Sequence, residues 1–238
     1  MTFGRTRIEL AIATVSLGML SGCVSDFEGR GPAQTETESI DLDKTESVAV
    51  QLRMGAGELS VRGGSPKLMD GEFSFRRLAM RPQVHYDATG FRGRLRVEEP
   101  SGVHTRNSRY RWDLRFNDDK PLDLEVEFGA GEGRLELGSL NLRSADIHMG
   151  VGELRLDLRG TPKNSYTVNL RGGVGEATVY LPQGVGIVAD AQGGIGGITA
   201  RGLEKRDGEY VNSAYGQSRT TVRLDIRGGI GAINLIGD

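Results

Sequence analysis

Apolar and polar residues alternate along most of the chain after about residue 47. Residues 145–151 carry an apolar side chain at every second position, and residues 154–158 do so again after a break. A period of two residues is typical of a β-strand with one buried face. Between the two segments the alternation slips by one residue beside glycines, which suit a bulge or a sharp bend. The pattern therefore predicts repeated strand–bend–strand units.

A glycine-rich motif marks each predicted bend and occurs six times. The first glycines of its Gly-x-Gly cores lie 21 residues apart (129 to 150), then 23 (150 to 173) and 21 (173 to 194), and a longer interval of 35 precedes Gly229. A repeat of about 20 residues indicates a solenoid, in which each repeat adds one coil. The copies span residues 54–59, 128–133, 149–154, 172–177, 193–198 and 228–233.

Alignment of the copies places apolar residues at two motif positions, one before the bend and one within it. We expect both positions to face a shared core, with like residues stacked on coils about 4.8 Å apart. The expected fold is an all-β, right-handed parallel β-helix-like solenoid of about six coils. The position before the bend is held by Leu52, Val126, Ile147, Leu170, Ala191 and Ile226, and the position within the bend by Ala56, Ala130, Val151, Val174, Ile195 and Ile230.

The pattern divides the chain into four parts. Residues 66–118 break the period although they contain further alternating segments, and we expect an elaborated cap there, because the end of a solenoid needs one. The residues just before the solenoid are acidic with few apolar side chains, which is typical of a flexible tether. The expected parts are a signal peptide at 1–22, the tether at 23–46, the cap with the first coil at 47–118 and the repeated coils at 119–238.

The first residues have the features of an export signal. Arg5 and Arg7 precede a mostly apolar stretch at residues 8–20, which is too short to span a bilayer comfortably, and no transmembrane helix is expected later in the chain. Residues 20–23, Leu-Ser-Gly-Cys, resemble the lipobox of bacterial lipoproteins, and Cys23 is the only cysteine. The resemblance implies that Cys23 carries lipid and anchors the chain to a membrane, outside the cytoplasm. A leftover reactive thiol and an ordinary cleavage site are the alternatives.

Composition narrows the function classes without indicating a partner. Glycine supplies 36 of 238 residues, about twice its average share, but only 7 prolines and no three-residue period are present, which excludes collagen. Without residues 1–22 the chain has 28 basic and 31 acidic side chains, and a net charge of about −3 is too small to indicate a partner. An exported chain is not expected to bind nucleic acid.

No motif predicts a catalytic, metal or cofactor site. Residues 184–189 fit only the loosest dinucleotide fingerprint, and no helix is expected after them to hold a pyrophosphate. Residues 172–180 approach a calcium β-roll repeat but have Ala177 where that repeat needs aspartate. The three histidines, His85, His104 and His148, do not have the spacing typical of zinc ligands.

Glutamates at one motif position form a candidate carboxylate ladder. Glu132, Glu153 and Glu176 occupy this position on consecutive repeats, and Glu58 matches them further off. If they are adjacent on stacked coils, their repulsion of roughly 1 kcal/mol per contact in water favours a bound cation. Alternatively, they are polar bend residues in solvent, balanced by arginines two positions further on.

Arginine is concentrated between residues 76 and 115, which hold ten arginines, no lysine and four acidic residues. Arg92, Arg94 and Arg96 alternate with other residues, which predicts three guanidinium groups on one face of a strand. The planar guanidinium group binds phosphate and carboxylate in a bidentate way, so this face is a candidate site for an anionic envelope polymer or a lipid head group. A solvated outer face, partly neutralised by the acidic tether, is the alternative.

Three stretches resemble the toast-rack family: residues 50–59, residues 122–132 and the closing Gly-Gly-Ile-Gly copies. The resemblance covers nearly the whole mature chain, and it implies a β-helical stack without known catalytic residues. It links the chain to the domain of the LiaF cell-wall-antibiotic-response proteins and, more loosely, to adhesin repeats. The lipid anchor expected for this chain would take the place of the membrane helices of LiaF.

We therefore expect a non-enzymatic lipoprotein of the cell envelope, whose solenoid supports structure or binds an anionic polymer or another envelope protein. A regulator of the envelope stress response, implied by the resemblance to LiaF, is the first alternative. A glycan-active enzyme is the second, because such enzymes occur on β-helices, but they cluster their site residues on one coil face and no such cluster stands out.

Overall fold

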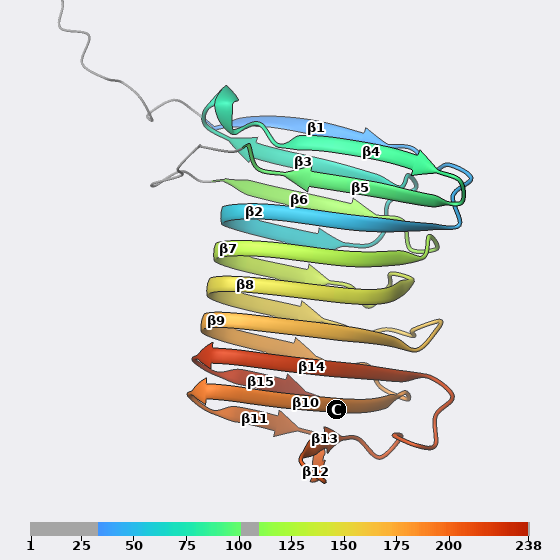
Figure 1. Ribbon diagram of the computed structural model, residues 1–238, viewed down its shortest axis with the longest axis vertical. Helices are drawn as coiled ribbons and strands as arrows, with labels where there is room; N and C mark the ends of the chain where they lie inside the picture. Colours follow the sequence, from blue (N-terminus) through green and yellow to red (C-terminus); the bar gives the residue numbers. More distant parts are fainter. Residues whose placement is uncertain (1–32, 101–109, 238) are drawn as a thin grey trace, which may run out of the picture. The chain divides into compact units, whose positions relative to one another are not determined.

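The computed structural model describes residues 33–100 and 110–237, and these residues form an almost purely β structure (Figure 1). Within these ranges one short 3-10 helix, η1 (Leu78–Met80), is present, and no helix is long and apolar enough to cross a membrane. The strands are β1 (Gln34–Ile40), β2 (Ser47–Arg62), β3 (Met69–Phe75), β4 (Gln83–Thr89), β5 (Arg92–Glu98), β6 (Arg111–Phe116), β7 (Leu122–Glu136), β8 (Leu142–Asp157), β9 (Tyr166–Tyr180), β10 (Gly186–Ile195), β11 (Ile198–Arg201), β12 (Glu204–Arg206), β13 (Glu209–Val211), β14 (Thr221–Ile230) and β15 (Ile233–Ile236).

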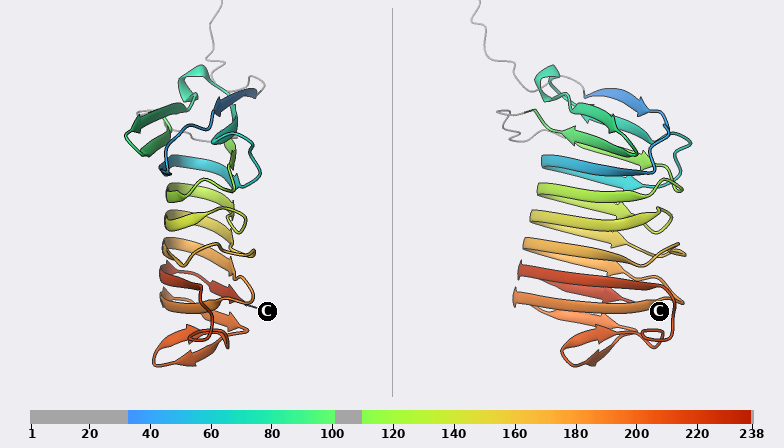
Figure 2. Two further views of the ribbon diagram at one scale, coloured as in Figure 1. Left: turned by 90° about the vertical axis from the view of Figure 1, so that its right-hand side faces the viewer. Right: turned by 45° about the vertical axis from the view of Figure 1, so that its right-hand side comes forward.

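Each repeat forms one coil made of two arms that meet at the glycine motif. In β7, residues 122–128 form the first arm, residues 132–136 form the second, and the bend lies between them. Alternate residues of both arms are buried, among them Val126 on the first arm and Leu135 on the second. The first arms of the coils form one layer and the second arms another (Figure 2), so the two layers enclose a single apolar core.

Neighbouring coils pair in parallel and in register, which places like motif positions opposite one another. Leu52 lies opposite Val126, Val126 lies opposite Ile147, and the series continues to Leu170. All six residues that were predicted to face the core before the bend are buried, so this part of the prediction is confirmed. Each coil thus adds one layer of apolar side chains to a core that continues along the stack.

The coils at one end of the stack do not follow chain order. The strand order is β2-β7-β8-β9-β14-β10, so the last coil of the sequence lies between β9 and β10. Ile226 of β14 therefore lies opposite Leu170 on one side and Ala191 on the other. The long interval before the last motif permits this order, because residues 202–220 include the β12–β13 hairpin and lead the chain around β10. β13 also pairs antiparallel with part of the outer edge of β10.

The apolar residues within the bends do not face the core, so the prediction for this position is wrong. In β8 the last inward side chain of the first arm is Met149 and the first of the second arm is Leu154, and the residues between them lie at the surface. A tight bend leaves no room for another inward side chain, because Met149 and Leu154 already fill the space between the layers. The exposed fractions are 53% for Val151, 44% for Val174, 52% for Ile230 and 73% for Ile195.

Residues 66–118 extend the stack by one coil and then cover it. β5 pairs in parallel with the first arm of β2 and β6 with its second arm, so the two strands form a coil outside β2. β4 pairs antiparallel with β5, β3 does so with β6, and β1 does so with β3. Trp112 of β6 packs edge-on against Phe73 of β3, with ring centroids 5.7 Å apart, and both are buried. Antiparallel strands therefore cover this end of the stack.

The acidic segment before the solenoid contains a strand where a flexible tether was expected. β1 pairs with β3 along its whole length. Arg81, which follows η1, forms ion pairs with Glu36 at 2.7 Å and with Glu38 at 3.6 Å. Two of the acidic side chains that suggested a solvated tether, Glu36 and Glu38, are thus held by a basic side chain of the cap. Residues 23–32 lie outside the described part of the chain.

The loop after β1 is also fixed to the cap, through the carboxylate of Asp43. This carboxylate accepts a hydrogen bond of 2.7 Å from the Tyr86 hydroxyl and one of 3.0 Å from the backbone N–H of Thr45. The Lys120 ammonium donates to the backbone carbonyl oxygen of Asp43 at 3.1 Å. The prediction of a flexible tether is therefore wrong for residues 34–46.

Candidate binding site

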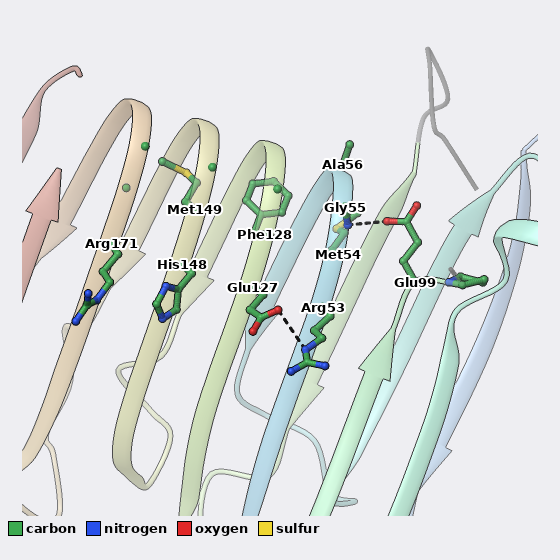
Figure 3. Close-up of a pocket in the computed structure, with 15 residues that line it drawn as sticks. Arg53, Met54, Gly55, Ala56, Glu99, Glu127, Phe128, His148, Met149 and Arg171 are labelled. Carbon is green, nitrogen blue, oxygen red and sulfur yellow. Dashed lines mark hydrogen bonds and ion pairs between the residues drawn. The ribbon is translucent and has the colours of Figure 1, made fainter. Parts of the chain in front are cut away.

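A groove follows the bends of four stacked coils on the side of the first arms (Figure 3). Its volume is about 1100 Å³, and it is open to solvent. We call it the bend groove. Its lining comes from β2, β7, β8, β9 and the two residues after β5: Arg53, Met54, Gly55, Ala56, Glu99, Pro100, Glu127, Phe128, Gly129, His148, Met149, Gly150, Arg171, Gly172 and Gly173.

Glycine forms the floor of the bend groove, and the stacking of the coils requires it. A Cβ atom at Gly150 would lie 2.3 Å from the carbonyl oxygen of Gly129, and one at Gly173 would lie 2.3 Å from that of Gly150. These separations are far below van der Waals contact, so a side chain at either position would push the coils apart. The consequence is an exposed strip of backbone that runs along the stack.

A row of outward side chains forms one wall of the groove. Arg53 binds Glu98 at 3.4 Å and Glu127 at 3.2 Å. Next to Glu127 in register come His148 and then Arg171, on the two following coils. Within residues 33–100 and 110–237 neither His148 nor Arg171 forms an ion pair or a side-chain hydrogen bond. The middle of the groove therefore offers two adjacent basic side chains that no acid of these residues neutralises.

Arg227 continues the row on β14, but its side chain already forms ion pairs with two acidic residues. Its guanidinium group lies 2.7 Å from Asp190 and 3.2 Å from Asp225. The hydrogen bond from Arg227 holds the pKa of the Asp190 carboxyl below its ordinary value. Arg227 is thus committed to the last two coils, whereas Arg171, directly opposite it on β9, is not.

Glu99 closes the groove at the cap end. Its Oε2 atom accepts a hydrogen bond of 2.6 Å from the backbone N–H of Gly55. The chain between β5 and β6 has no glycine motif, so the Glu99 carboxylate accepts the hydrogen bond of a bend N–H that a carbonyl oxygen of a neighbouring coil would otherwise accept.

The bend residues form a continuous apolar row beside the groove, which we call the bend ridge. Its members lie opposite one another coil by coil. Beneath the ridge a hollow of about 20 Å³ opens between β9 and β14. A Cβ atom at Gly172 would meet nothing within 4 Å, so the inner position that Met149 fills on β8 is empty on β9. In stack order the ridge is Ala56, Ala130, Val151, Val174, Ile230 and Ile195.

The structure brings the four glutamates of the candidate ladder together on the outer face of the second arms. Glu58, Glu132, Glu153 and Glu176 lie opposite one another in register. An Arg111 nitrogen lies 2.6 Å from the Glu58 carboxylate. In the described ranges no group of three or more acidic, histidine or cysteine side chains is arranged to hold a metal ion. Cation binding by the ladder stays a prediction.

Arg92, Arg94 and Arg96 point outward from β5. Arg96 forms an ion pair of 3.7 Å with Asp87 of the neighbouring β4, whereas Arg92 and Arg94 have no ion pair among the described residues. On the other side of β5, the residues of β2 in register with the three arginines are uncharged: Ser47, Ala49 and Gln51.

The remaining sequence candidates do not assemble into a site. His85 lies on β4 and His148 on β8, which are not neighbours in the sheet. Cys23 and His104 lie outside the described residues.

Comparison with known families matches residues 29–180 to the N-terminal domain of toast_rack, DUF2154. The chain belongs to the toast-rack family. The matched region extends from before β1 to the end of β9, so it covers the cap and the regular coils. No curated protein matches this toast-rack protein.

One solved structure matches a larger share of the chain than the family model does. A putative cell adhesion protein from Clostridium sporogenes ATCC 15579 is 33% identical to this toast-rack protein, with a TM-score of 0.79, and the match covers 86% of this chain and 99% of that one. A putative adhesin from Bacteroides fragilis NCTC 9343 matches at 12% identity and a TM-score of 0.35, over 86% of this chain and 97% of that one. Only the first is similar enough to support the fold.

The bend groove was not among the binding sites predicted from the sequence of this toast-rack protein. The motif contains a signal for it, because His148 and Arg171 stand two residues before the first glycine of the Gly-x-Gly core. That position is charged or basic in five of the six copies, the exception being Gln192. What the motif does not show is which of these charges are paired, since the partners Glu98 and Asp190 lie on other coils.

Proposed function

We propose that this toast-rack protein is a non-enzymatic, lipid-anchored binding module of the bacterial cell envelope, which holds an anionic envelope polymer on the arginine face of β5. The family and the 33% identical cell adhesion protein support a binding or structural role at the cell surface. The lipobox-like residues 20–23 support export and lipid attachment at Cys23.

The outward row of Arg92, Arg94 and Arg96 carries the proposal. Alternate residues of a strand lie about 6.6 Å apart, so the three guanidinium groups can meet successive anionic groups of one extended polymer. The β2 side of the row is uncharged, and on the β4 side Asp87 pairs only with Arg96. The strand is held between β2 and β4, so the spacing of the three residues along the backbone is set before a ligand arrives.

Binding of anionic polymers should therefore weaken when the arginine face loses its charge. The test uses the mature chain, residues 23–238, with Cys23→Ser so that it stays free of lipid. Replacing Arg92, Arg94 and Arg96 with Gln should lower the affinity for teichoic acid or lipopolysaccharide about tenfold or more, and the difference should shrink as salt rises, because the Debye length is only about 8 Å at physiological ionic strength. Binding isotherms at two salt concentrations measure both effects.

The matched control removes the same charge from other exposed positions, with Arg134, Arg155 and Arg201 replaced by Gln. If it weakens binding as much as the β5 triple variant does, net charge and not the arginine face is responsible. No binding of the parent to teichoic acid, lipopolysaccharide or anionic vesicles would leave the three arginines as solubilising residues.

Cys23→Ala in the full chain should abolish acylation and leave the protein either uncleaved or released from the membrane. Labelled palmitate and detergent-phase partitioning measure the two results in cells. Equal incorporation of label by the variant and the parent would contradict lipid attachment at Cys23.

A further inference from the structure

The geometry of the bends points to a second binding site, separate from the arginine face. We infer that the bend groove and the bend ridge together bind one single-chain anionic amphiphile, with the anionic head group on His148 and Arg171 and the apolar chain along the ridge toward β10. The inference goes beyond the proposed function and uses none of the arginines of β5.

The head-group position follows from the pairing of charges along the groove wall. Arg53 is held between Glu98 and Glu127, and Arg227 is held by the carboxylates of the last two coils. Between them, His148 and Arg171 project side by side from adjacent coils, about 4.8 Å apart along the stack, which suits two contacts to one carboxylate or phosphate. An anion is therefore complementary to the groove only at this point.

The apolar part follows from the residues of the ridge. The bend accepts alanine, as Ala56 and Ala130 show, so the fold does not need a larger side chain there. Nevertheless the four coils from β8 to β10 carry valine or isoleucine at this position, with roughly half or more of each side chain in solvent. A continuous exposed apolar row of this kind is typical of a surface that something covers.

The groove and the hollow beneath the ridge meet beside Gly172. Met149, Gly172 and Gly173 line both the bend groove and the small apolar hollow between β9 and β14. Beyond the hollow, the glycine strip continues along the bends of β14 and β10, where a Cβ atom at Gly229 would lie 2.2 Å from the carbonyl oxygen of Gly173 and one at Gly194 would lie 2.4 Å from that of Gly229. A linear apolar chain whose head lies at Arg171 can thus follow the strip with one side against Val174, Ile230 and Ile195.

This placement explains why a single molecule of mixed chemistry fits better than an anion or an apolar chain alone. An inorganic anion would use the two basic groups and leave the ridge in water. An uncharged chain would cover the ridge and leave the two basic groups without a partner. Only an amphiphile uses both, because the two features are continuous and lie in line.

The test titrates the lipid-free mature chain with dodecanoate below its micellar concentration and measures binding by calorimetry. Dodecanoate should bind with one molecule per chain, while dodecyl maltoside and inorganic phosphate should each bind at least about tenfold more weakly. Replacing His148 and Arg171 with Gln should lower the affinity for dodecanoate about tenfold or more and leave the affinity for dodecyl maltoside unchanged. Val174 and Ile230 are both exposed, so replacing them with Asn should leave the protein folded. The replacement should lower the affinity for dodecanoate, and circular dichroism checks the fold.

The control variants separate this site from the rest of the surface. The Arg92, Arg94 and Arg96 triple Gln variant should bind dodecanoate as the parent does, so a failure of the polymer proposal leaves this result intact. Gly172→Val, which fills the hollow, should lower the affinity for dodecanoate without changing any charge. The inference is wrong if dodecyl maltoside binds as well as dodecanoate, if the His148 and Arg171 variant is unaffected, or if the ridge variants instead turn a dimer into a monomer, because a second copy would then cover the ridge.

Discussion

Replacing Leu170 with aspartate will prevent the stack from folding, whereas the same change at Val174, four residues later, will leave it folded. Both residues are apolar members of the same repeat and both were predicted to face the core. Leu170 is 1% exposed, so its replacement would bury an unpaired carboxylate between the two layers and cost more than about 4 kcal/mol. Val174 is 44% exposed at the apex of the bend, where a carboxylate keeps its water.

Urea unfolding of the two variants, followed by circular dichroism, measures the difference. The Val174→Asp midpoint should lie close to that of the parent, because surface substitutions usually change stability by less than about 0.5 kcal/mol. Thr is the matched control at Val174, since it is similar in size to valine and carries no charge, and Met is the matched control at Leu170, because it is apolar and similar in volume to leucine. Equal loss of stability in the two Asp variants would mean that the bend residues face the core after all.

Replacing Gly152 with alanine should destabilise the stack severely, whereas alanine at Gly172 should be tolerated. Gly152 has φ of 137°, and a Cβ atom there would lie 1.9 Å from the carbonyl oxygen of Gly131 on the coil before it. The variant must both strain the backbone and separate two coils, which we expect to cost about 3 kcal/mol or more. At Gly172 a Cβ atom meets nothing within 4 Å, and the backbone conformation is an ordinary one.

The Gly172→Ala variant should match the parent or gain about 0.4–1 kcal/mol, because alanine restricts the unfolded chain and partly fills the hollow. Denaturant unfolding of both variants in one series provides the comparison. A Gly152→Ala protein as stable as the parent would show that the coils are not packed at their bends as described. A marked loss at Gly172 would show that the hollow is needed for packing.

The repeat could be predicted from the sequence because it depends on local properties. Alternation in residues 145–151 specifies a strand with one buried face, and glycine at fixed intervals specifies where each strand must bend. In-register stacking then follows, because identical motifs pair best with like against like. Ile147 and Leu170 were therefore placed correctly in the core.

The direction of the bend residues could not be predicted in the same way. Alternation assigns a face only while the strand is regular, and between Met149 and Leu154 it is interrupted by Gly152, whose φ is 137°. Valine and isoleucine are apolar wherever they lie, so composition at this position predicted burial. Their exposure results from the meeting of two layers, which is a property of the coil and not of its residues.

The candidate sites also differ in whether they could be predicted from the sequence. Arg92, Arg94 and Arg96 lie on an extended strand, and their common outward face followed from their spacing. The availability of His148 and Arg171 did not, because it depends on which acidic residues of other coils lie within reach of each basic group. The fixed position of residues 34–46 likewise depends on partners in the cap that are distant in the sequence.

The sequence by itself determined that this protein is a stack of strand–bend–strand coils with glycine at each bend, because periodicity and steric limits act over a few residues. Only the tertiary structure decided the order of the coils. β14 pairs with β9 and β10 on its two edges, and a free strand edge accepts any coil of matching register, whatever its place in the chain. The tertiary structure also decided which apolar residues remain in water, because the space between the two layers closes just before the bend ridge begins.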